Sequence, residues 1–488
     1  MEVRIRKFKE KDIPNKIKWI NNSENNQYLH YDLPLEYEKT LNWFKKNKDR
    51  RDRYDGIIEV NSIPVGLIGL LSIDMKNSKA EYYIALGETK FKGKGIAKLA
   101  SIKLLEYAFK EIGINKIYLF TEVENKSAQK LFERVGFKKE GLLKEDIKNG
   151  NEFADRYVYG ICKEDYYNKK ERDKNEIKPT EIVELKDKLY SNNIYMKRDD
   201  LIPFSFGGNK ARKAKLFFED IKEIKSDCVV TYGSSSSNHC RIIANIAASK
   251  GLPCYIISPS AEDNITYNRK ITNLFEANII KCPVSEVSDT IDSTLEELRS
   301  KGYNPYFIQG GGHGNIGTQA YINAYDEILD YEDDRDVKFD YVFHASGTGT
   351  TQAGLVCGHI LNKDDKNIVG ISVARKNPYG GKVVLDSVND YLHSIGENSI
   401  TDKELKFIDD YIIDGYGTSN EEVLEIIEGT LINDGIPLDK TYTGKAFWGM
   451  KEFIKKNKIK NKNILFIHTG GVPLFFDDLE ELINEGRN

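Results

Sequence analysis

The chain lacks the features that mark several specialised classes of protein. Its six cysteines form no Cys-x-x-Cys pair and stand among only seven histidines, which argues against a zinc site and a disulfide framework. No apolar run approaches the roughly 18 residues of a membrane span, and the alternating first residues do not resemble a signal peptide. The net charge of -4 offers no basic field for nucleic acid. We therefore expect a cytoplasmic protein, without a metal, whose partners are small molecules.

The composition that remains is typical of soluble globular domains. Hydrophobic residues make up 40% of the chain and charged residues 30%. A length of 488 residues exceeds what one hydrophobic core organises. The stretch Cys162–Lys178 is highly charged with little apolar periodicity, as in a solvated linker. We therefore expect a first domain over residues 1–165, a linker over 166–179 and a second domain over 180–488.

The first domain contains a glycine loop between an expected strand and an expected helix. Lys79–Leu86 reads as a strand, Lys90–Gly95 as a loop and Ile96–Phe109 as a helix. Amides at a helix start, approached through glycines, can bind a pyrophosphate. The loop does not end in the Gly-Lys-Ser/Thr of a Walker A sequence. By itself it is explained equally well as an ordinary tight turn.

The segment that follows gives the first domain a family resemblance. A strand over Lys116–Val123 precedes a short helix over Glu124–Phe137 that closes with glycine. The loop matches the Gln/Arg-x-x-Gly-x-Gly/Ala motif of the GNAT-family N-acetyltransferases, with Lys90 in its first place. The helix matches that family's Asn-x-x-Ala-x-x-Leu-(Tyr/Phe)-x-x-x-Gly-Phe motif. Residues 1–165 thus resemble a GNAT domain, which implies a mixed sheet with flanking helices and acetyl-CoA as co-substrate.

The GNAT resemblance also implies positions for acetyl-CoA and a class of acceptor. Asn125 would lie beside the pantetheine arm. Trp19–Asn22 and Leu41–Phe44 further resemble the amino-sugar N-acetyltransferases of pseudaminic acid synthesis, which implies an amine on a sugar as acceptor. The pyrophosphate would be held by the backbone of the loop residues Phe91, Gly93, Lys94 and Gly95.

The proton donor for the leaving thiolate departs from the family pattern. Many GNAT members place Tyr where this chain has Phe132, which has no proton to give. Ser127 or water would then supply the proton, or the domain binds a ligand without catalysis. Glu124 is a candidate base, with an exposed charge at a strand end as the alternative.

The second domain alternates expected strands and helices, and its first motif is a lysine. The alternation predicts an α/β fold of mainly parallel sheets covered by helices, with ligands at the carboxyl ends of strands. Lys210 stands in Phe206–Lys213, just after two glycines and close to two further cations. Such a lysine suits a Schiff-base role because it can lose its proton. A surface lysine in a basic loop is the alternative.

Two more motifs follow expected strands. Ser346–Gly354 opens a helix after an apolar strand, so its amides and hydroxyls can hold a phosphate. Ser236–His239 also begins a helix and suits a carboxylate or the ring oxygen of a cofactor. A glycine-threonine turn and a helix N-cap are the respective alternatives.

In this order, the three motifs resemble one group of enzymes. Residues 180–488 resemble the fold-type II pyridoxal phosphate (PLP) enzymes of the D-cysteine desulfhydrase and 1-aminocyclopropane-1-carboxylate (ACC) deaminase group. The resemblance implies PLP as cofactor and a two-lobed parallel-sheet fold like that of tryptophan synthase β. Members are usually dimers, which favours a homodimer through this domain. The matching stretches are Lys197–Leu201, Gly207–Lys213, Ser237–His239, Gly310–Gly312, the Ser346 loop, Tyr442–Lys445 and His468–Pro473.

By position, the resemblance assigns roles to individual residues of the second domain. Lys210 would form the Schiff base with PLP, and Asn238 would contact its ring hydroxyl. Ser237 would bind the substrate carboxylate or relay a proton. Tyr416 and Tyr442 would flank the substrate and assist proton transfer, with a core role as the alternative for Tyr416. The phosphate would be bound by Lys213, Gly347, Thr348, Gly349, Thr350 and Thr351.

Two positions discriminate within the group. ACC deaminases carry Glu and Leu where this chain has Thr443 and Thr469, and the desulfhydrases resemble this chain. A carboxylate near the pyridine nitrogen keeps the ring a strong electron sink, whereas a hydroxyl need not. The resemblance therefore implies elimination from D-cysteine to pyruvate, ammonia and sulfide. An ACC deaminase, a sulfo-lyase and a racemase are the alternatives.

Overall fold

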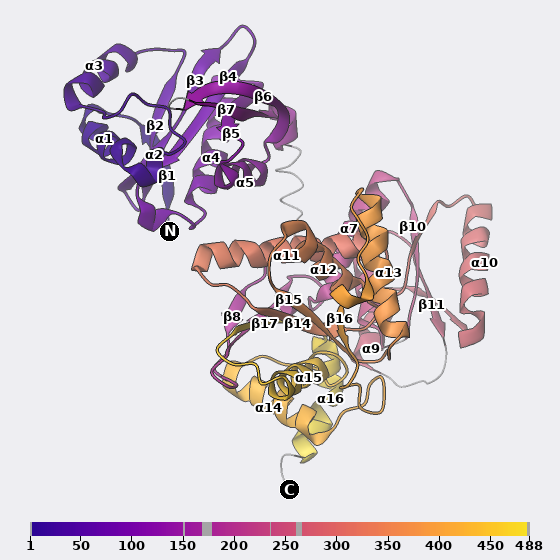
Figure 1. Ribbon diagram of the computed structural model, residues 1–488. Helices are drawn as coiled ribbons and strands as arrows, with labels where there is room; N and C mark the ends of the chain where they lie inside the picture. The colour runs from indigo at the N-terminus through magenta and orange to yellow at the C-terminus, as the bar shows by residue number, and fades with distance from the viewer. Residues whose placement is uncertain (1, 150–151, 168–177, 235, 260–265, 486–488) are drawn as a thin grey trace. The chain divides into compact units, whose positions relative to one another are not determined.

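The computed structural model describes residues 2–149, 152–167, 178–234, 236–259 and 266–485. They form two compact units, one built on Met1–Glu176 and one on Ile177–Glu332 with Val337–Asn488 (Figure 1). Of the expected linker, residues 168–177 lie outside the described part, so the linker stays a prediction. Tyr166, its first expected residue, is buried in the core of the first unit.

The first unit is a seven-stranded sheet with helices on both faces. Neighbouring strands are antiparallel except β4 and β5, which are parallel. In spatial order the strands are β1 (Val3–Lys7), β2 (Tyr54–Val60), β3 (Ile63–Asp74), β4 (Lys79–Leu86), β5 (Lys116–Glu122), β7 (Glu152–Cys162) and β6 (Lys138–Asn149). The helices are α1 (Ile13–Asn21), α2 (Ser23–Asn26), α3 (Tyr37–Asn47), α4 (Ile96–Tyr107) and α5 (Lys126–Val135).

Side-chain alternation along β2 divides the helices of this unit between the two faces. Ile57 packs in a cluster with Trp19 of α1, whereas its neighbour Ile58 packs in a cluster with Leu104 of α4. Successive strand residues point to opposite faces, so α1 and α4 cover opposite sides of the sheet. The expected mixed sheet with flanking helices is confirmed.

The two parallel strands of the first unit pair only at their beginnings. Lys79–Glu81 of β4 pair with Lys116–Tyr118 of β5. Beyond these residues no ladder joins the described remainder of the two strands, which ends at Leu86 and Glu122. β4 and β5 therefore diverge toward their carboxyl ends, close to the loop that carries Gly93.

The second unit contains two sheets that are almost entirely parallel. One has the order β12-β11-β10-β13 and the other β16-β15-β14-β17-β9-β8, in which only β8 and β9 pair antiparallel. The expected parallel α/β architecture is confirmed (Figure 1). The strands are β8 (Ile182–Glu184), β9 (Asn193–Lys197), β10 (Cys228–Tyr232), β11 (Cys254–Pro259), β12 (Asn278–Cys282), β13 (Pro305–Ile308), β14 (Tyr341–Ser346), β15 (Asn367–Ser372), β16 (Lys406–Ile408) and β17 (Asn463–Ile467).

Helices follow most of these strands, as the alternating pattern predicts. Their amino-terminal ends come after the carboxyl ends of the strands, which gathers strand-to-helix loops at one edge of each sheet. The helices are α7 (Asn209–Glu223), α8 (Asn238–Ser249), α9 (Tyr267–Asn273), α10 (Val287–Ser300), α11 (Asn315–Arg335), α12 (Thr350–Asn362), α13 (Tyr379–Ser394), α14 (Glu421–Asp434), α15 (Thr443–Lys456) and α16 (Val472–Glu485).

Two further properties bear on the environment of the protein. All six cysteines are free thiols, and five of them are buried. Over the described residues, every helix is too short or too polar to cross a bilayer.

Candidate functional sites

Lys210 is the second residue of α7, and two glycines determine how its helix begins. Gly207 and Gly208 have φ values of +61° and +92°, which L side chains rarely adopt. A Cβ on Gly207 would lie 2.2 Å from the carbonyl oxygen of Asp200, and one on Gly208 would lie 2.7 Å from that of Thr469. The glycine pair thus permits the close approach that brings Lys210 beside the end of β17.

Among the described residues, no carboxylate forms a hydrogen bond or an ion pair with the ammonium of Lys210. Its Nζ donates a hydrogen bond to the carbonyl oxygen of Gly311 at 2.9 Å. Burial, together with the nearby cation of Arg375, lowers the pKa of Lys210 to about 8. A larger fraction of the lysine is therefore the neutral nucleophile near neutral pH than for an exposed lysine.

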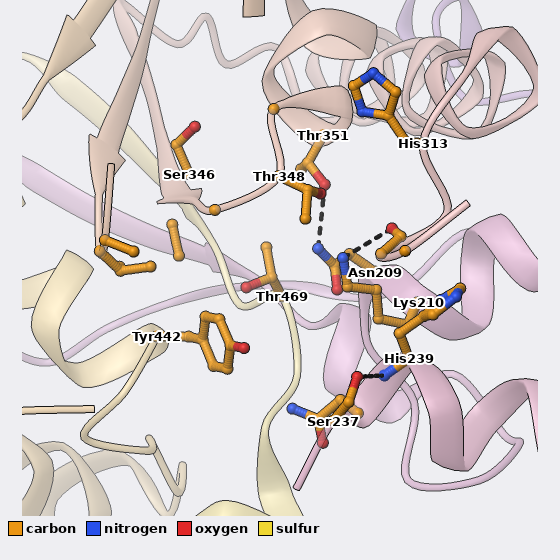
Figure 2. A pocket seen from close by; sticks show the side chains of 18 of the residues that line it. Asn209, Lys210, Ser237, His239, His313, Ser346, Thr348, Thr351, Tyr442 and Thr469 are labelled. Atoms are coloured by element: carbon orange, nitrogen blue, oxygen red, sulfur yellow. Dashed lines mark hydrogen bonds between the residues drawn. The ribbon is translucent and has the colours of Figure 1, made fainter. Parts of the chain in front are cut away.

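Lys210 lies in the wall of a cavity of about 570 Å³ between strand ends and helix starts. Figure 2 shows side chains from several elements around this one space. None of the described residues that line it is acidic. Nine further residues that the sequence predicts for the site line the same cavity: Ser237, Asn238, Gly347, Thr348, Gly349, Thr351, Tyr416, Tyr442 and Thr469.

The expected phosphate loop connects β14 to α12 along one wall of the cavity. Gly349 caps the helix with φ +104°, and the first amides of α12 have no intrahelical acceptor. Thr351 Oγ1 accepts a hydrogen bond from Asn209 Nδ2 at 3.1 Å, which joins the loop to the helix of Lys210 (Figure 2). The loop therefore offers amides and hydroxyls to an anion.

Lys213 and Thr350 occupy a different place from the rest of the predicted phosphate site. Neither lines the cavity: Lys213 is 1% exposed and donates to Thr350 Oγ1 at 3.1 Å. Burial and the neighbouring Lys210 hold the pKa of Lys213 well below its usual value. This hydrogen bond joins α7 to the start of α12, and contact of the two residues with the phosphate stays a prediction.

The Ser237–Asn238 turn combines the capping role with a place in the cavity wall. Ser237 Oγ accepts hydrogen bonds from the amides of His239 and Cys240 at 3.2 and 3.3 Å, so Ser237 is the N-cap of α8. Asn238 Oδ1 accepts from Asn268 Nδ2 at 2.9 Å. The Asn238 amide group is thereby oriented with its Nδ2 left as a donor. Asn268 lies in α9 and belongs to none of the motifs, so the sequence does not indicate its contact with Asn238.

A pair of tyrosines, Tyr416 and Tyr442, also lines the cavity. The hydroxyl oxygens of Tyr416 and Tyr442 are 2.5 Å apart, and Tyr416 is 54% exposed, so it is not a core residue. Burial raises the pKa of both phenols. Lys445 holds the segment of Tyr416 by donating to the carbonyl oxygens of Ile412 and Gly415 at 3.1 and 2.7 Å.

The two discriminating threonines do not share one environment. Thr469 lines the cavity, whereas Thr443 is fully buried and donates to Asp439 Oδ2 at 2.7 Å. Asp439 also accepts from the amide of Tyr442 at 2.7 Å. Burial raises the pKa of this carboxyl to about 6. Asp439 does not line the cavity, but its hydrogen bond with the backbone of Tyr442 helps to position that tyrosine. The sequence motifs do not indicate this role of Asp439.

The predicted acetyl-CoA residues lie where β4 leads into α4. Phe91 ends a short 3-10 turn (Thr89–Phe91), and Lys94 stands between Gly93 and Gly95, whose φ values are +73° and +69°. α4 begins directly after Gly95, so its free amides face this turn. The loop has the form expected of an anion site, and its contact with acetyl-CoA stays a prediction.

The second GNAT motif also has mixed roles. Asn125 Oδ1 accepts from the amide of Ala128 at 3.1 Å and caps α5. Phe132 is 6% exposed and packs edge-on against Tyr82 with ring centroids 6.1 Å apart. Phe132 is thus a core residue, while the side chains of Ser127 and Glu124 are exposed.

Comparison with known proteins agrees with this division of the chain. Residues 174–470 match the model of the family described as pyridoxal-phosphate dependent enzyme, and residues 2–138 match that described as acetyltransferase (GNAT) domain. The D-cysteine desulfhydrase of Serratia proteamaculans is 33% identical over 296 residues, which are 58% of this chain and 88% of that protein. A Pyrococcus abyssi protein that bears the name of a 1-aminocyclopropane-1-carboxylate deaminase is 33% identical over 294 residues, 60% of this chain and 88% of its own.

A solved structure supports the same assignment for the second unit. The crystal structure of an ACC deaminase homologue superposes with a TM-score of 0.58 at 30% identity, covering 63% of this chain and 94% of that one. The amino-sugar specificity suggested by Trp19–Asn22 and Leu41–Phe44 stays a prediction. The chain therefore belongs to the family of pyridoxal-phosphate dependent enzymes and carries a GNAT acetyltransferase domain ahead of the PLP domain.

Proposed function

We propose that the second domain is a PLP-dependent lyase that releases ammonia from a small amino acid, in the manner of a D-cysteine desulfhydrase. The observation that carries this proposal is Lys210, an amine with a pKa lowered to about 8 in a cavity beside the loop at Gly347–Thr351. An amine that loses its proton near neutral pH is the nucleophile that the aldehyde of PLP requires.

The residues around the cavity fit PLP in their chemistry. Amides and hydroxyls at the start of α12 would hold the phosphate, and a lining without acidic residues, over the part the structure describes, suits its charge. Asn238 would donate to the ring oxygen, because its own Oδ1 is already occupied by Asn268. Gly311 leaves room beside the lysine, since a Cβ there would lie 3.1 Å from Lys210 Nζ.

The side chains of this chain would then manage substrate binding and protons. When bound, PLP supplies the electron sink for a carbanion at the substrate Cα. Ser237 Oγ accepts from two amides, so its own proton is left to donate to the substrate carboxylate. Lys210 Nζ would take the proton from Cα, and the Tyr416–Tyr442 pair would give a proton to the leaving group, because the raised pKa values keep both phenols protonated.

Elimination of a thiolate is the reaction we favour within the group. This chain has Thr443 where the ACC deaminases carry Glu, and no described residue of the cavity lining is acidic, so the pyridine nitrogen would lack a carboxylate partner and the ring would be a weaker electron sink. Loss of a good leaving group such as sulfide demands less of that sink than opening a cyclopropane. An ACC deaminase, a sulfo-lyase and a racemase are the alternatives, and all of them keep the same roles for Lys210 and Ser237.

The colour and the products of the purified protein test this proposal. PLP-loaded protein should absorb in the visible range, and Lys210→Ala should abolish that band. Lys222→Ala, an exposed lysine of the same helix, should retain it. A colourless wild type incubated with PLP would refute the assignment. Sulfide and pyruvate from D-cysteine, compared with turnover of ACC and D-serine, would separate the reactions.

We further propose that the first domain transfers acetyl from acetyl-CoA to an amine, with an amino sugar as one candidate acceptor. The loop Phe91–Gly95 at the start of α4 supports the acyl-CoA site, with Asn125 beside the pantetheine arm. A second candidate is a module that binds acyl-CoA without transfer, because Phe132 lies in the core and has no proton to donate. Calorimetry with acetyl-CoA and thiol release with amines separate the two, since binding without release supports the second.

We also propose a cytoplasmic protein that forms a homodimer through the PLP domain. The six free thiols support a reducing compartment. Sedimentation of the full chain tests the dimer, and a monomer at micromolar concentration would refute it.

A further inference from the structure

Near the carboxyl ends of β4 and β5, two buried side-chain oxygens have no aligned hydrogen-bond donor among the described residues. Glu122, the last residue of β5, is 6% exposed, and its Oε1 has no aligned hydrogen-bond donor. Asn25 Oδ1 is also buried without an aligned hydrogen-bond donor. The other amide atom of this residue, Asn25 Nδ2, donates a hydrogen bond at 2.9 Å to the carbonyl oxygen of Gly87, the residue after β4. Leaving a buried acceptor unpaired costs about 1–3 kcal/mol, so both oxygens can accept a hydrogen bond from a ligand.

The segment Glu24–His30, here named the bridging segment, reaches from one strand end to the other. Near the end of β4, Glu24 Oε2 accepts a hydrogen bond from Thr89 Oγ1 at 3.2 Å. Beyond the end of β5, the hydroxyl of Tyr28 donates to the carbonyl oxygen of Glu124 at 3.5 Å. The bridging segment therefore lies across the diverging ends of the two strands, at the loop predicted to bind the pyrophosphate.

His30 completes the group at the β5 end. Its Nε2 is 2.9 Å from Glu122 Oε1, with the two side chains 30% and 7% exposed. This contact is not aligned as a hydrogen bond, and it becomes an ion pair only when the imidazole of His30 is protonated. A purely structural pair would close the bridging segment on β5, yet it would leave Asn25 Oδ1 unpaired. With Nε2 turned to the carboxylate, Nδ1 of His30 is the nitrogen left to accept a proton.

We propose that Asn25, His30 and Glu122 form the acceptor site of the acyltransferase domain, and that its substrate is a primary amine that arrives protonated. This rests on the proposed acyl-CoA function of the same domain. The buried carboxylate of Glu122 offsets the charge of the ammonium, and Oδ1 of Asn25 accepts one of its N–H groups. The group is rich in acceptors and the amine supplies donors.

The transfer step balances with acyl-CoA as the only co-reactant. His30 Nδ1 takes one proton from the ammonium and leaves a neutral amine, while Glu122 stabilises the imidazolium. The amine nitrogen attacks the thioester carbonyl carbon, so that a C–N bond forms and the C–S bond breaks with its electron pair on sulfur. The acylated nitrogen gives a proton to the thiolate, and His30 returns its proton to solvent.

The test follows thiol release from acetyl-CoA by the full-length protein with spermidine, glucosamine and butylamine. For an amine that is consumed, His30→Ala should lower kcat/KM by about 10²-fold or more, and added imidazole should restore part of the rate. Glu122→Gln should raise KM for the amine. Calorimetry should find the same acetyl-CoA affinity within threefold in both variants. Glu38→Gln, an exposed carboxylate on α3, is the control and should change nothing.

Each contrary result has a distinct meaning. A His30→Ala protein that keeps its kcat/KM, or one that imidazole does not rescue, overturns the role of His30. A loss with Glu124→Gln equal to that with Glu122→Gln moves the site to the exposed strand end and overturns the proposal. Acetyl-CoA binding without transfer to any of the amines overturns the acceptor site alone, whereas a wild type that binds no acetyl-CoA overturns the acyltransferase function as well.

Discussion

The hydroxyls of Tyr416 and Tyr442 share one short hydrogen bond of 2.5 Å in the wall of the cavity. Each phenol reaches that position by a different support, Tyr442 through Asp439 and the segment of Tyr416 through Lys445. The position of the pair thus depends on two buried charged residues, Asp439 and Lys445, that do not line the cavity. The role of the hydroxyls and the role of these two residues can therefore be tested with separate variants.

Removing one hydroxyl of the pair should slow catalysis without releasing the cofactor. Tyr442→Phe should lower kcat by about 10²-fold or more, as loss of a general acid does, and the visible absorbance should persist. Tyr416→Phe should cost less, because Tyr416 is 54% exposed and water can take its place. The double variant should be no slower than Tyr442→Phe, since the two act as a unit. Additive losses would show that they act independently.

Lys445→Met should release the segment of Tyr416. The two carbonyl oxygens that Lys445 holds would be left without their donor, at about 1–3 kcal/mol in the free energy of unfolding. KM for the amino acid should rise because Tyr416 loses its fixed place. Lys451→Met in the same helix is the control. It removes an ion pair with Asp187, whose side chain is 45% exposed, and the loss should lower the free energy of unfolding by under about 1 kcal/mol. Equal effects of the two variants would contradict the role of Lys445.

Asp439 should make stability depend on pH in the direction opposite to a salt-bridged carboxyl. Its pKa of about 6 in the folded protein exceeds the value near 4 of an unfolded chain. The folded state therefore holds the proton more tightly, and stability is lost as the pH rises from about 4 through 6. Asp439→Asn cannot lose a proton. Wild type should lose up to about 3 kcal/mol in its free energy of unfolding between pH 4 and 7, and the Asp439→Asn variant should not show this loss. Urea unfolding of both proteins at a series of pH values measures the difference.

Asn268→Asp should weaken PLP binding from a position outside the cavity. The variant replaces the amide that donates to Asn238 Oδ1 with a carboxylate, so Asn238 would turn its donor away from the cofactor. The dissociation constant for PLP should rise about tenfold or more, the loss of roughly one hydrogen bond. Asn273→Asp, exposed at the end of the same helix, is the control. Fluorescence titration of the apoprotein measures both, and unchanged affinity in Asn268→Asp would remove its role.

Gly311→Ala should crowd Lys210 directly. The added Cβ would lie 2.6 Å from Thr348 Cγ2 and 3.1 Å from Lys210 Nζ. Gly314→Ala is a matched control, because Gly314 also has a positive φ of +103° but open space around it. Both variants should lose similar stability from backbone strain, and only Gly311→Ala should lose visible absorbance on titration with PLP. Equal loading of the two variants would contradict the crowding.

The sequence predicted the sites best where neighbours in the chain are also neighbours in space. Lys210, which follows the glycine pair, and the Gly/Thr loop after β14 belong to local motifs, and both line the cavity. The hydrogen bond between Lys213 and Thr350 is not readable from spacing, because the two residues are 137 positions apart in the chain. Contact of Lys213 with the phosphate stays a prediction.

Supports that come from distant parts of the chain were not predictable in the same way. Asn268 reaches Asn238 across 30 residues, and His30 reaches Glu122 across 92 positions in the chain. Asn268 and His30 stand in no recurring motif. Their roles follow only from burial and hydrogen-bond geometry, which the sequence does not show. Phe132 was recognised as a departure from the GNAT pattern, but its packing against Tyr82 is visible only in the fold.

The absence of acidic side chains from the described lining of the PLP cavity has a consequence for selectivity between substrates. The lining includes the cations Lys210 and Arg375, so the cavity is expected to repel an ammonium ion. A zwitterion also carries a carboxylate, and we therefore expect the cavity to bind zwitterions better than plain amines. The proposed acceptor site contains the carboxylate of Glu122 and would instead favour plain amines. With PLP bound as proposed, this difference in charge would keep its aldehyde apart from plain amines, and the two proposed activities would not inhibit each other.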